Sequence, residues 1–178
     1  FPKDILLTIE GDYKESIKLV KQNFDHIFFT GSTETGKYIM KSASKNLTPI
    51  TLELSGTNPV IIFKNANLKI AAKRIVWGKF FNSGQSCMAP NHIFVEKEIE
   101  TQLVEELKKF ITIFYGKNPL NSKNLSKLQK EQYSKSSELL KRYKKEKRIL
   151  FGGTFSKKKL KISPTILKVK LEEKNIIQ

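Results

Sequence analysis

Short apolar runs alternate with amphipathic stretches along the first part of the chain. Apolar runs of four or five residues bounded by turn residues are typical of buried strands, and amphipathic stretches with capping residues predict helices. We expect strands at 5–9, 26–30 and 50–54 and helices at 13–22 and 33–46. This strand–helix alternation predicts βαβ units and a parallel sheet.

The second part of the chain continues the same alternation. The patterns predict strands at 60–63, 92–95, 148–151 and 161–167, and helices at 68–82, 98–114 and 125–147. The last of these helices is long and polar, with few positions that suit a core. The chain is therefore predicted to have an α/β fold.

The chain is strongly basic, and this charge requires an explanation. Lys and Arg number 33 against 17 Asp and Glu, which gives a formal net charge of +16. Such a charge can follow a nucleic-acid backbone. However, the basic residues are nearly all Lys, and aromatic side chains are not interleaved with them as in a stacking platform. We interpret the charge as a solvated surface and do not expect nucleic acid as a partner.

Composition also indicates the cellular compartment and argues against disulfides, metal sites and membrane spans. A single cysteine excludes an internal disulfide and favours a reducing, cytoplasmic setting. His26 and His92 lie far apart in sequence from each other and from Cys87, so no metal site is expected. No apolar run approaches the ~20 residues of a membrane span. The chain begins at Phe1 rather than Met, which suggests a piece of something longer.

Cys87 lies in the polar stretch 81–90, between a predicted helix and a predicted strand. Loops on a rigid scaffold often carry reactive groups, whereas a lone cysteine is more often inert. A helical turn beginning at Cys87 would favour the thiolate through the helix dipole. From the residues alone, both interpretations remain open.

Two further features accompany this cysteine. In the segment 29–37 a predicted strand is followed by Gly31 and Ser32 and then by a predicted helix. The free backbone amides at the start of such a helix can bind a phosphate. Glu53 ends an apolar strand, and burial there would favour a role as general base. Either feature alone is common in proteins that bind nothing at that position.

Taken together, three segments resemble signatures of the aldehyde dehydrogenase superfamily. They are 29–37, 52–56 and 81–87, in the family's order and with its spacing of 34 residues between Glu53 and Cys87. Further segments look most like the class 3, fatty-aldehyde branch; these are 24–26, 77–79, 114–119 and 163–167. The resemblance covers essentially the whole chain.

The resemblance implies NAD(P)⁺-dependent oxidation of an aldehyde, in which Cys87 is the nucleophile and Glu53 activates the water that hydrolyses a thioester. It also implies that Phe81 lies near the aldehyde entrance. The implied cofactor-binding residues are Thr30, Gly31, Ser32, Gly36, Leu54, Ser55 and Gly56. Ser55 and Thr57 depart from the family, which commonly has glycine and lysine at these positions.

The resemblance further implies a Rossmann-type cofactor domain, of which residues 1–54 are the last part, followed by part of an α/β catalytic domain at 55–178. The family's oxyanion-hole asparagine and ribose-binding residues would lie outside 1–178, so we expect little activity from this chain alone. The family usually forms homo-oligomers, here expected to be a dimer.

Two other hypotheses remain open from the sequence. The chain could be a truncated, inactive remnant that serves as a basic binding or scaffold module, or a relative that passes its acyl group to another acceptor. Retention of both Glu53 and Cys87 favours the hydrolysing enzyme.

Overall fold

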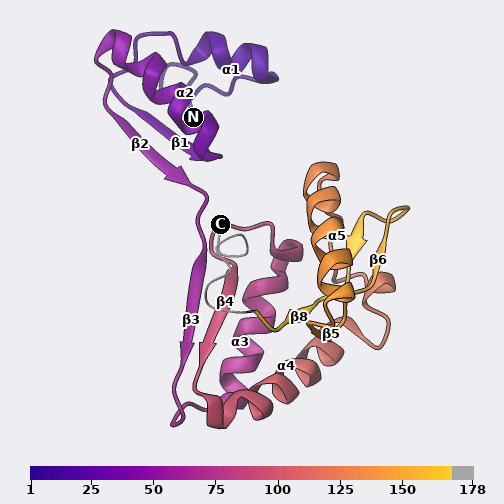
Figure 1. Ribbon diagram of the computed structural model, residues 1–178. Coiled ribbons are helices and arrows are strands. Elements are labelled where there is room, and N and C mark those ends of the chain that lie inside the picture. The colour runs from indigo at the N-terminus through magenta and orange to yellow at the C-terminus, as the bar shows by residue number, and fades with distance from the viewer. Residues whose placement is uncertain (170–178) are drawn as a thin grey trace. The chain divides into compact units, whose positions relative to one another are not determined.

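The computed structural model describes residues 1–169, and the chain divides into two compact units, residues 1–55 and 56–178 (Figure 1). Both units contain a parallel pair of strands with helices packed on it, so the predicted α/β fold is confirmed. Within residues 1–169, every helix is too short or too polar to cross a bilayer.

The first unit is a βαβ arrangement. Strands β1 (Ile27–Gly31) and β2 (Ile50–Leu54) are parallel, and α2 (Thr33–Ala43) connects them through the short 3-10 helix η1 (Ser44–Asn46). Helix α2 buries Ile39 and Ala43. Helix α1 (Tyr13–Leu19) begins at Asp12, whose carboxylate accepts from the Lys14 amide as part of a capping box. The predicted elements from residue 13 to residue 54 are therefore confirmed, although α1 ends earlier than expected.

The strand predicted at 5–9 is wrong. These residues form no strand, and their apolar side chains Ile5, Leu6, Leu7 and Ile9 are all exposed. An apolar run becomes a strand only where a neighbouring strand pairs with its amides and carbonyls. No strand in the described part of the chain pairs with this segment.

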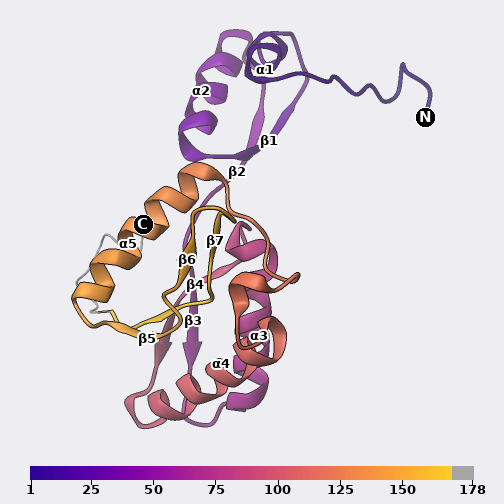
Figure 2. The same cartoon turned by 90° about the vertical axis from the view of Figure 1, so that its right-hand side faces the viewer.

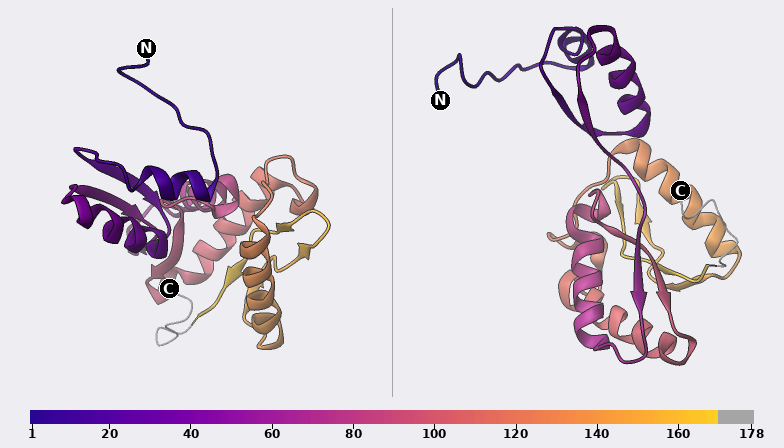
Figure 3. Two further views of the ribbon diagram at one scale, coloured as in Figure 1. Left: turned by 90° about the horizontal axis from the view of Figure 1, so that it is seen from above. Right: turned by 90° about the vertical axis from the view of Figure 1, so that its left-hand side faces the viewer.

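The second unit begins with a second parallel pair, β3 (Asn58–Ile62) and β4 (Pro90–Val95), which run side by side next to α3 (Figure 3). Helices α3 (Leu68–Phe80) and α4 (Glu100–Tyr115) pack together over a shared core. Its buried members include Ala72, Val76, Leu103, Leu107 and Ile111. Short 3-10 helices lie at η2 (Phe81–Gly84), η3 (Lys97–Ile99) and η4 (Pro119–Asn121). Ile70, an apolar residue of α3, is 50% exposed.

The remainder of this unit contains α5 (Lys130–Lys145) and four short strands. Strands β5 (Ile149–Phe151) and β8 (Ile166–Leu167) pair antiparallel, as do β6 (Phe155–Ser156) and β7 (Lys161–Ile162), which lie side by side in Figure 2. The strand predicted at 161–167 is thus two short strands, and β6 was not predicted. Helix α5 buries more than its polar sequence suggested, along one face; these residues are Tyr133, Ser137, Leu140 and Tyr143.

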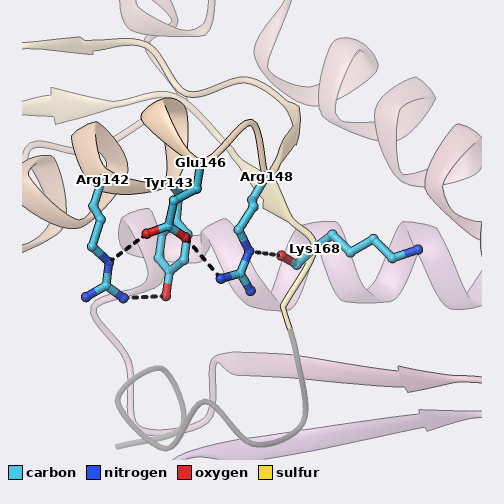
Figure 4. A network of polar contacts seen from close by, with 5 residues as sticks. All are labelled: Arg142, Tyr143, Glu146, Arg148 and Lys168. Atoms are coloured by element: carbon cyan, nitrogen blue, oxygen red, sulfur yellow. Dashed lines mark hydrogen bonds and ion pairs between the residues drawn. The ribbon is translucent and has the colours of Figure 1, made fainter.

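A polar network joins the end of α5 to the strands that follow it (Figure 4). The ring of Tyr143 is fully buried, with the guanidinium carbons of Arg142 and Arg148 each 4.9 Å from its centroid. Arg142 Nη2 donates to the Tyr143 hydroxyl at 2.9 Å, and Glu146 pairs with both arginines. Arg148 Nε donates to the Lys168 carbonyl at 2.9 Å, which ties β5 to the segment after β8.

Tyr143→Phe is expected to lower the free energy of unfolding of the full protein by about 1 kcal/mol, because Arg142 loses a partly buried acceptor while the ring contacts stay. Urea unfolding followed by circular dichroism measures the change. Tyr13→Phe is the matched control, since Tyr13 is 70% exposed and its replacement should have no measurable effect. Equal stability of the two variants would contradict a role for the hydroxyl.

Candidate active site

The junction between β1 and α2 presents hydrogen-bond donors. Ser32 is the N-cap of α2, and its Oγ accepts from the Thr35 amide at 3.2 Å and contacts Thr35 Oγ1 at 2.8 Å. The first amides of a helix have no partner within the helix, and they carry the positive end of its dipole. Glu34 in the same turn would repel an anion, but Lys37 Nζ pairs with its carboxylate at 3.0 Å. The junction therefore presents donors to an anion such as a phosphate.

Gly36 has a packing role in this unit. It is buried, and a Cβ at this position would lie only 2.7 Å from Leu54 Cδ2. Glycine therefore allows α2 to lie close to the end of β2. This contact sets how closely the capped end of α2 approaches Leu54.

Glu53 lies at the same sheet edge as the junction between β1 and α2. In the parallel register Thr30 pairs with Glu53 and Gly31 with Leu54, so these four residues are brought together. The burial of Glu53 that the sequence left open does not occur, because its side chain is exposed. Successive strand residues point to opposite faces, so Glu53 points away from the face on which Leu54 contacts α2. Ser55 and Gly56, which follow the strand, are also exposed.

Cys87 is exposed and lies in a turn between η2 and β4. A helix does not begin at this residue, so the helix dipole considered from the sequence does not act on the thiol. The reason is local: β4 begins at Pro90, which leaves too few residues for a helical turn.

Asn58 holds the Cys87 turn from the side of β3. Its Nδ2 donates to the Cys87 carbonyl at 2.6 Å and to the Ala89 carbonyl at 3.1 Å, and its backbone amide donates to Asn91 Oδ1 at 3.2 Å. Sequence reasoning missed this residue. The signal in the sequence was an asparagine side chain at the start of a strand, and this strand pairs with the one that follows the cysteine.

An exposed aromatic pair lies just before the cysteine turn. Trp77 and Phe81 are 63% and 59% exposed, and their ring centroids are 5.7 Å apart. Met88, next to Cys87, is 81% exposed. Large exposed apolar side chains therefore precede and follow the thiol along the chain.

Lys79 lies beneath the same loop. A Cβ on Gly84 would lie 3.7 Å from Lys79 Nζ and 2.9 Å from the Lys79 carbonyl oxygen, so the loop passes directly over this residue. Burial lowers the pKa of the Lys79 ammonium below its ordinary value of 10.5, because desolvation disfavours the charged form.

Lys79→Met is expected to stabilise the full protein at neutral pH, because it removes the cost of burying a charge and keeps the apolar stem. In the wild type the unfolded state binds the proton more tightly, so the free energy of unfolding should rise with pH from the lowered pKa of Lys79 up to 10.5. The variant should lose this alkaline rise. Thermal unfolding between neutral and alkaline pH measures both effects, with exposed Lys73→Met as the control. An alkaline rise retained in Lys79→Met would contradict the assignment.

The residues implied by the family resemblance are thus distributed over both units. The first unit holds Thr30, Gly31, Ser32, Gly36, Glu53, Leu54 and Ser55, and the second unit holds Gly56, Phe81 and Cys87. Among residues 1–169, no group of three or more His, Cys, Asp or Glu side chains is placed to hold a metal ion.

Comparisons with known proteins show which family this sequence resembles. A sequence model of the aldehyde dehydrogenase family matches residues 1–178. The dimeric NADP-preferring aldehyde dehydrogenase of Rattus norvegicus is 39% identical over 165 residues, covering 93% of this chain and 36% of the rat protein. Aldehyde dehydrogenase family 3 member A2 of Pongo abelii is also 39% identical, over 93% of this chain and 33% of the relative.

A solved structure has the same fold. The substrate-bound state of Staphylococcus aureus AldH superposes with a TM-score of 0.88 at 37% identity, covering 96% of this chain and 37% of that one. This chain therefore spans about a third of the length of the relatives that it matches. The expected likeness to the class 3 branch is confirmed. The chain belongs to the aldehyde dehydrogenase family.

Proposed function

We propose that the protein containing this chain oxidises an aldehyde to a carboxylic acid with NAD⁺ or NADP⁺ as the oxidant. The observation that carries the proposal is an exposed thiol, Cys87, held by Asn58 at a turn between a helix and a parallel strand in a chain of this family. The rat relative is named NADP-preferring, which supports a nicotinamide dinucleotide as cofactor.

The cofactor is bound by the β1–α2 junction and by the residues at the end of β2. Thr30, Gly31 and Ser32 at the β1–α2 junction contact its phosphates, where the free amides of α2 and the Ser32 hydroxyl are available. Leu54, Ser55 and Gly56 line its nicotinamide end, and Gly36 keeps α2 close to Leu54. When bound, the nicotinamide supplies a hydride acceptor. In this proposal residues 1–54 belong to the cofactor domain and 55–178 to the thiol-bearing domain.

Cys87 is the nucleophile. Its exposed thiol gives its proton to water, and the sulfur forms a bond to the aldehyde carbon while the π bond of the carbonyl breaks, so that the oxygen becomes the alkoxide of a thiohemiacetal. After oxidation the acyl group remains on Cys87 as a thioester. The turn that Asn58 holds fixes the backbone of Cys87 while this bond forms and breaks.

Glu53 is the general base of the second half of the reaction. Its carboxylate takes a proton from water, and the resulting hydroxide adds to the thioester carbon, which releases the carboxylic acid and returns the thiolate. An exposed carboxylate at a strand end has access to the water that this step consumes.

The substrate is an aliphatic aldehyde of medium or long chain. Trp77, Phe81 and Met88, which are close to Cys87 in the sequence, expose large apolar side chains, and covering such side chains with an alkyl chain is favourable. Phe81 lies at the aldehyde entrance. The active form is a homodimer, which the name of the rat relative supports.

The test uses the full-length protein. Purified enzyme is mixed with NAD⁺ or NADP⁺ and a series of straight-chain aldehydes, and reduction of the cofactor is followed by absorbance. We expect aldehyde-dependent reduction, with kcat/KM rising with chain length. No aldehyde-dependent reduction with either cofactor would overturn the activity, and a flat chain-length series would overturn the substrate assignment alone.

A further inference from the structure

Three consecutive residues before Cys87 have left-handed backbone conformations. Asn82 has a φ of 48°, Ser83 of 56° and Gly84 of 81°. Glycine adopts this region readily, but side-chain-bearing residues do so at a cost. Such a turn persists only where the surroundings hold it in place. The contacts that hold this turn therefore indicate which part of the loop must be kept in place.

Two side chains hold this turn to the segment before α5. Ser83 Oγ donates to the Ser126 carbonyl at 2.7 Å. Gln85 Nε2 donates to the Asn82 carbonyl at 3.1 Å and to the Lys127 carbonyl at 3.0 Å. Gln85 Oε1 accepts from the Gln129 amide at 3.0 Å, so its carboxamide joins three backbone groups.

The segment that receives these bonds is itself fixed. Leu125 and Leu128 on either side of Ser126 and Lys127 are buried, and the Leu128 amide donates to the Leu160 carbonyl at 2.8 Å. The turn is thus fastened to a loop segment that two buried leucine side chains hold against the rest of the unit.

The positions of these bonds relative to Cys87 indicate their purpose. Gln85 holds the chain two residues before the thiol, and Asn58 holds the Cys87 and Ala89 carbonyls after it. Between these two anchors, the backbone that carries the thiol has little freedom to rotate. A nucleophile misplaced by about 1 Å can lose a hundredfold in rate.

We propose that Gln85 is a positioning residue for Cys87, whose carboxamide fastens the left-handed turn to the backbone of Lys127 and Gln129. The effect of Gln85 on aldehyde oxidation rests on the proposed function, whereas its hydrogen bonds to Lys127 and Gln129 do not. Gln85 touches no reacting atom, and it acts through the direction that it imposes on the Cys87 backbone.

The test compares three variants of the full-length protein. Gln85→Met removes all three bonds, Gln85→Glu keeps only the bond accepted from Gln129, and Gln102→Met at an exposed position of α4 is the control. For Gln85→Met we expect kcat for aldehyde oxidation to fall about tenfold to hundredfold, while KM for the cofactor stays within about twofold. Gln85→Glu should recover part of this loss, and Gln102→Met should match the wild type.

Native-state hydrogen exchange gives a second readout. Amides of residues 82–88 should exchange about tenfold faster or more in Gln85→Met, whereas those of α3 and α4 should be unchanged. Unchanged exchange in the loop, or faster exchange with unchanged kcat, would overturn the positioning role. Exchange that rises equally across α3 and α4 would also overturn it, because that result describes global destabilisation. Absence of aldehyde oxidation in the wild type would overturn the proposed function. Hydrogen exchange of residues 82–88 would then test by itself whether Gln85 holds the loop.

Discussion

Cys87→Ser is expected to lower kcat for aldehyde oxidation by about 10³-fold or more, because a serine hydroxyl is a far weaker nucleophile than a thiolate and Cys87 is the only cysteine in the chain. Since the side chain is exposed in a turn, its replacement should leave Tm almost unchanged. Steady-state reduction of the cofactor by the full-length protein measures the first effect and thermal unfolding the second.

Met88→Leu is the control for this variant, because it alters the next residue of the same turn without touching the thiol. It should retain aldehyde oxidation. Iodoacetamide should inactivate the wild type in step with labelling of Cys87. Substantial activity in Cys87→Ser would exclude Cys87 as the nucleophile.

Glu53→Gln is expected to lower steady-state turnover by about 10²–10⁴-fold, because the amide cannot accept the proton of the hydrolytic water. Attack by Cys87 does not use this carboxylate in our proposal. The first turnover should therefore survive, and rapid mixing should show a burst of reduced cofactor equal to the enzyme concentration. This separation distinguishes a base for hydrolysis from a base for the thiol.

Glu10→Gln is the matched control in the first unit, where an exposed carboxylate outside the helices and strands is neutralised in the same way. It should turn over like the wild type. Loss of both burst and turnover in Glu53→Gln would instead assign Glu53 to activation of Cys87. Normal turnover would remove it from the mechanism.

Patterns confined to neighbouring residues predicted much of the fold. The helices at α1 and α3 were expected, and Asp12 and Asn67 cap them; the parallel pairing of β1 with β2 was also expected. These features depend on interactions over a few residues, or on alternation of apolar and polar positions. The failures occurred where a partner decides the outcome, as at residues 5–9, which have the composition of a strand but no neighbour in the described chain.

The candidate site was also predicted in part, again where the signal lies in neighbouring residues. The order and spacing of the segments around Gly31, Glu53 and Cys87 are sufficient to indicate the family. The exposure of Glu53 was not predictable from its strand, because the burial of a strand face depends on what packs against it.

The chain sequence by itself determined the α/β alternation, the capped helices and the family of the protein. Only the tertiary structure decided how Cys87 is held: in a turn rather than at a helix end, with Asn58 on one side and Gln85 fastened to Lys127 on the other. The contacts join residues 29 and 42 positions apart. Their geometry depends on the path of the whole unit, whereas a sequence pattern reports interactions between near neighbours.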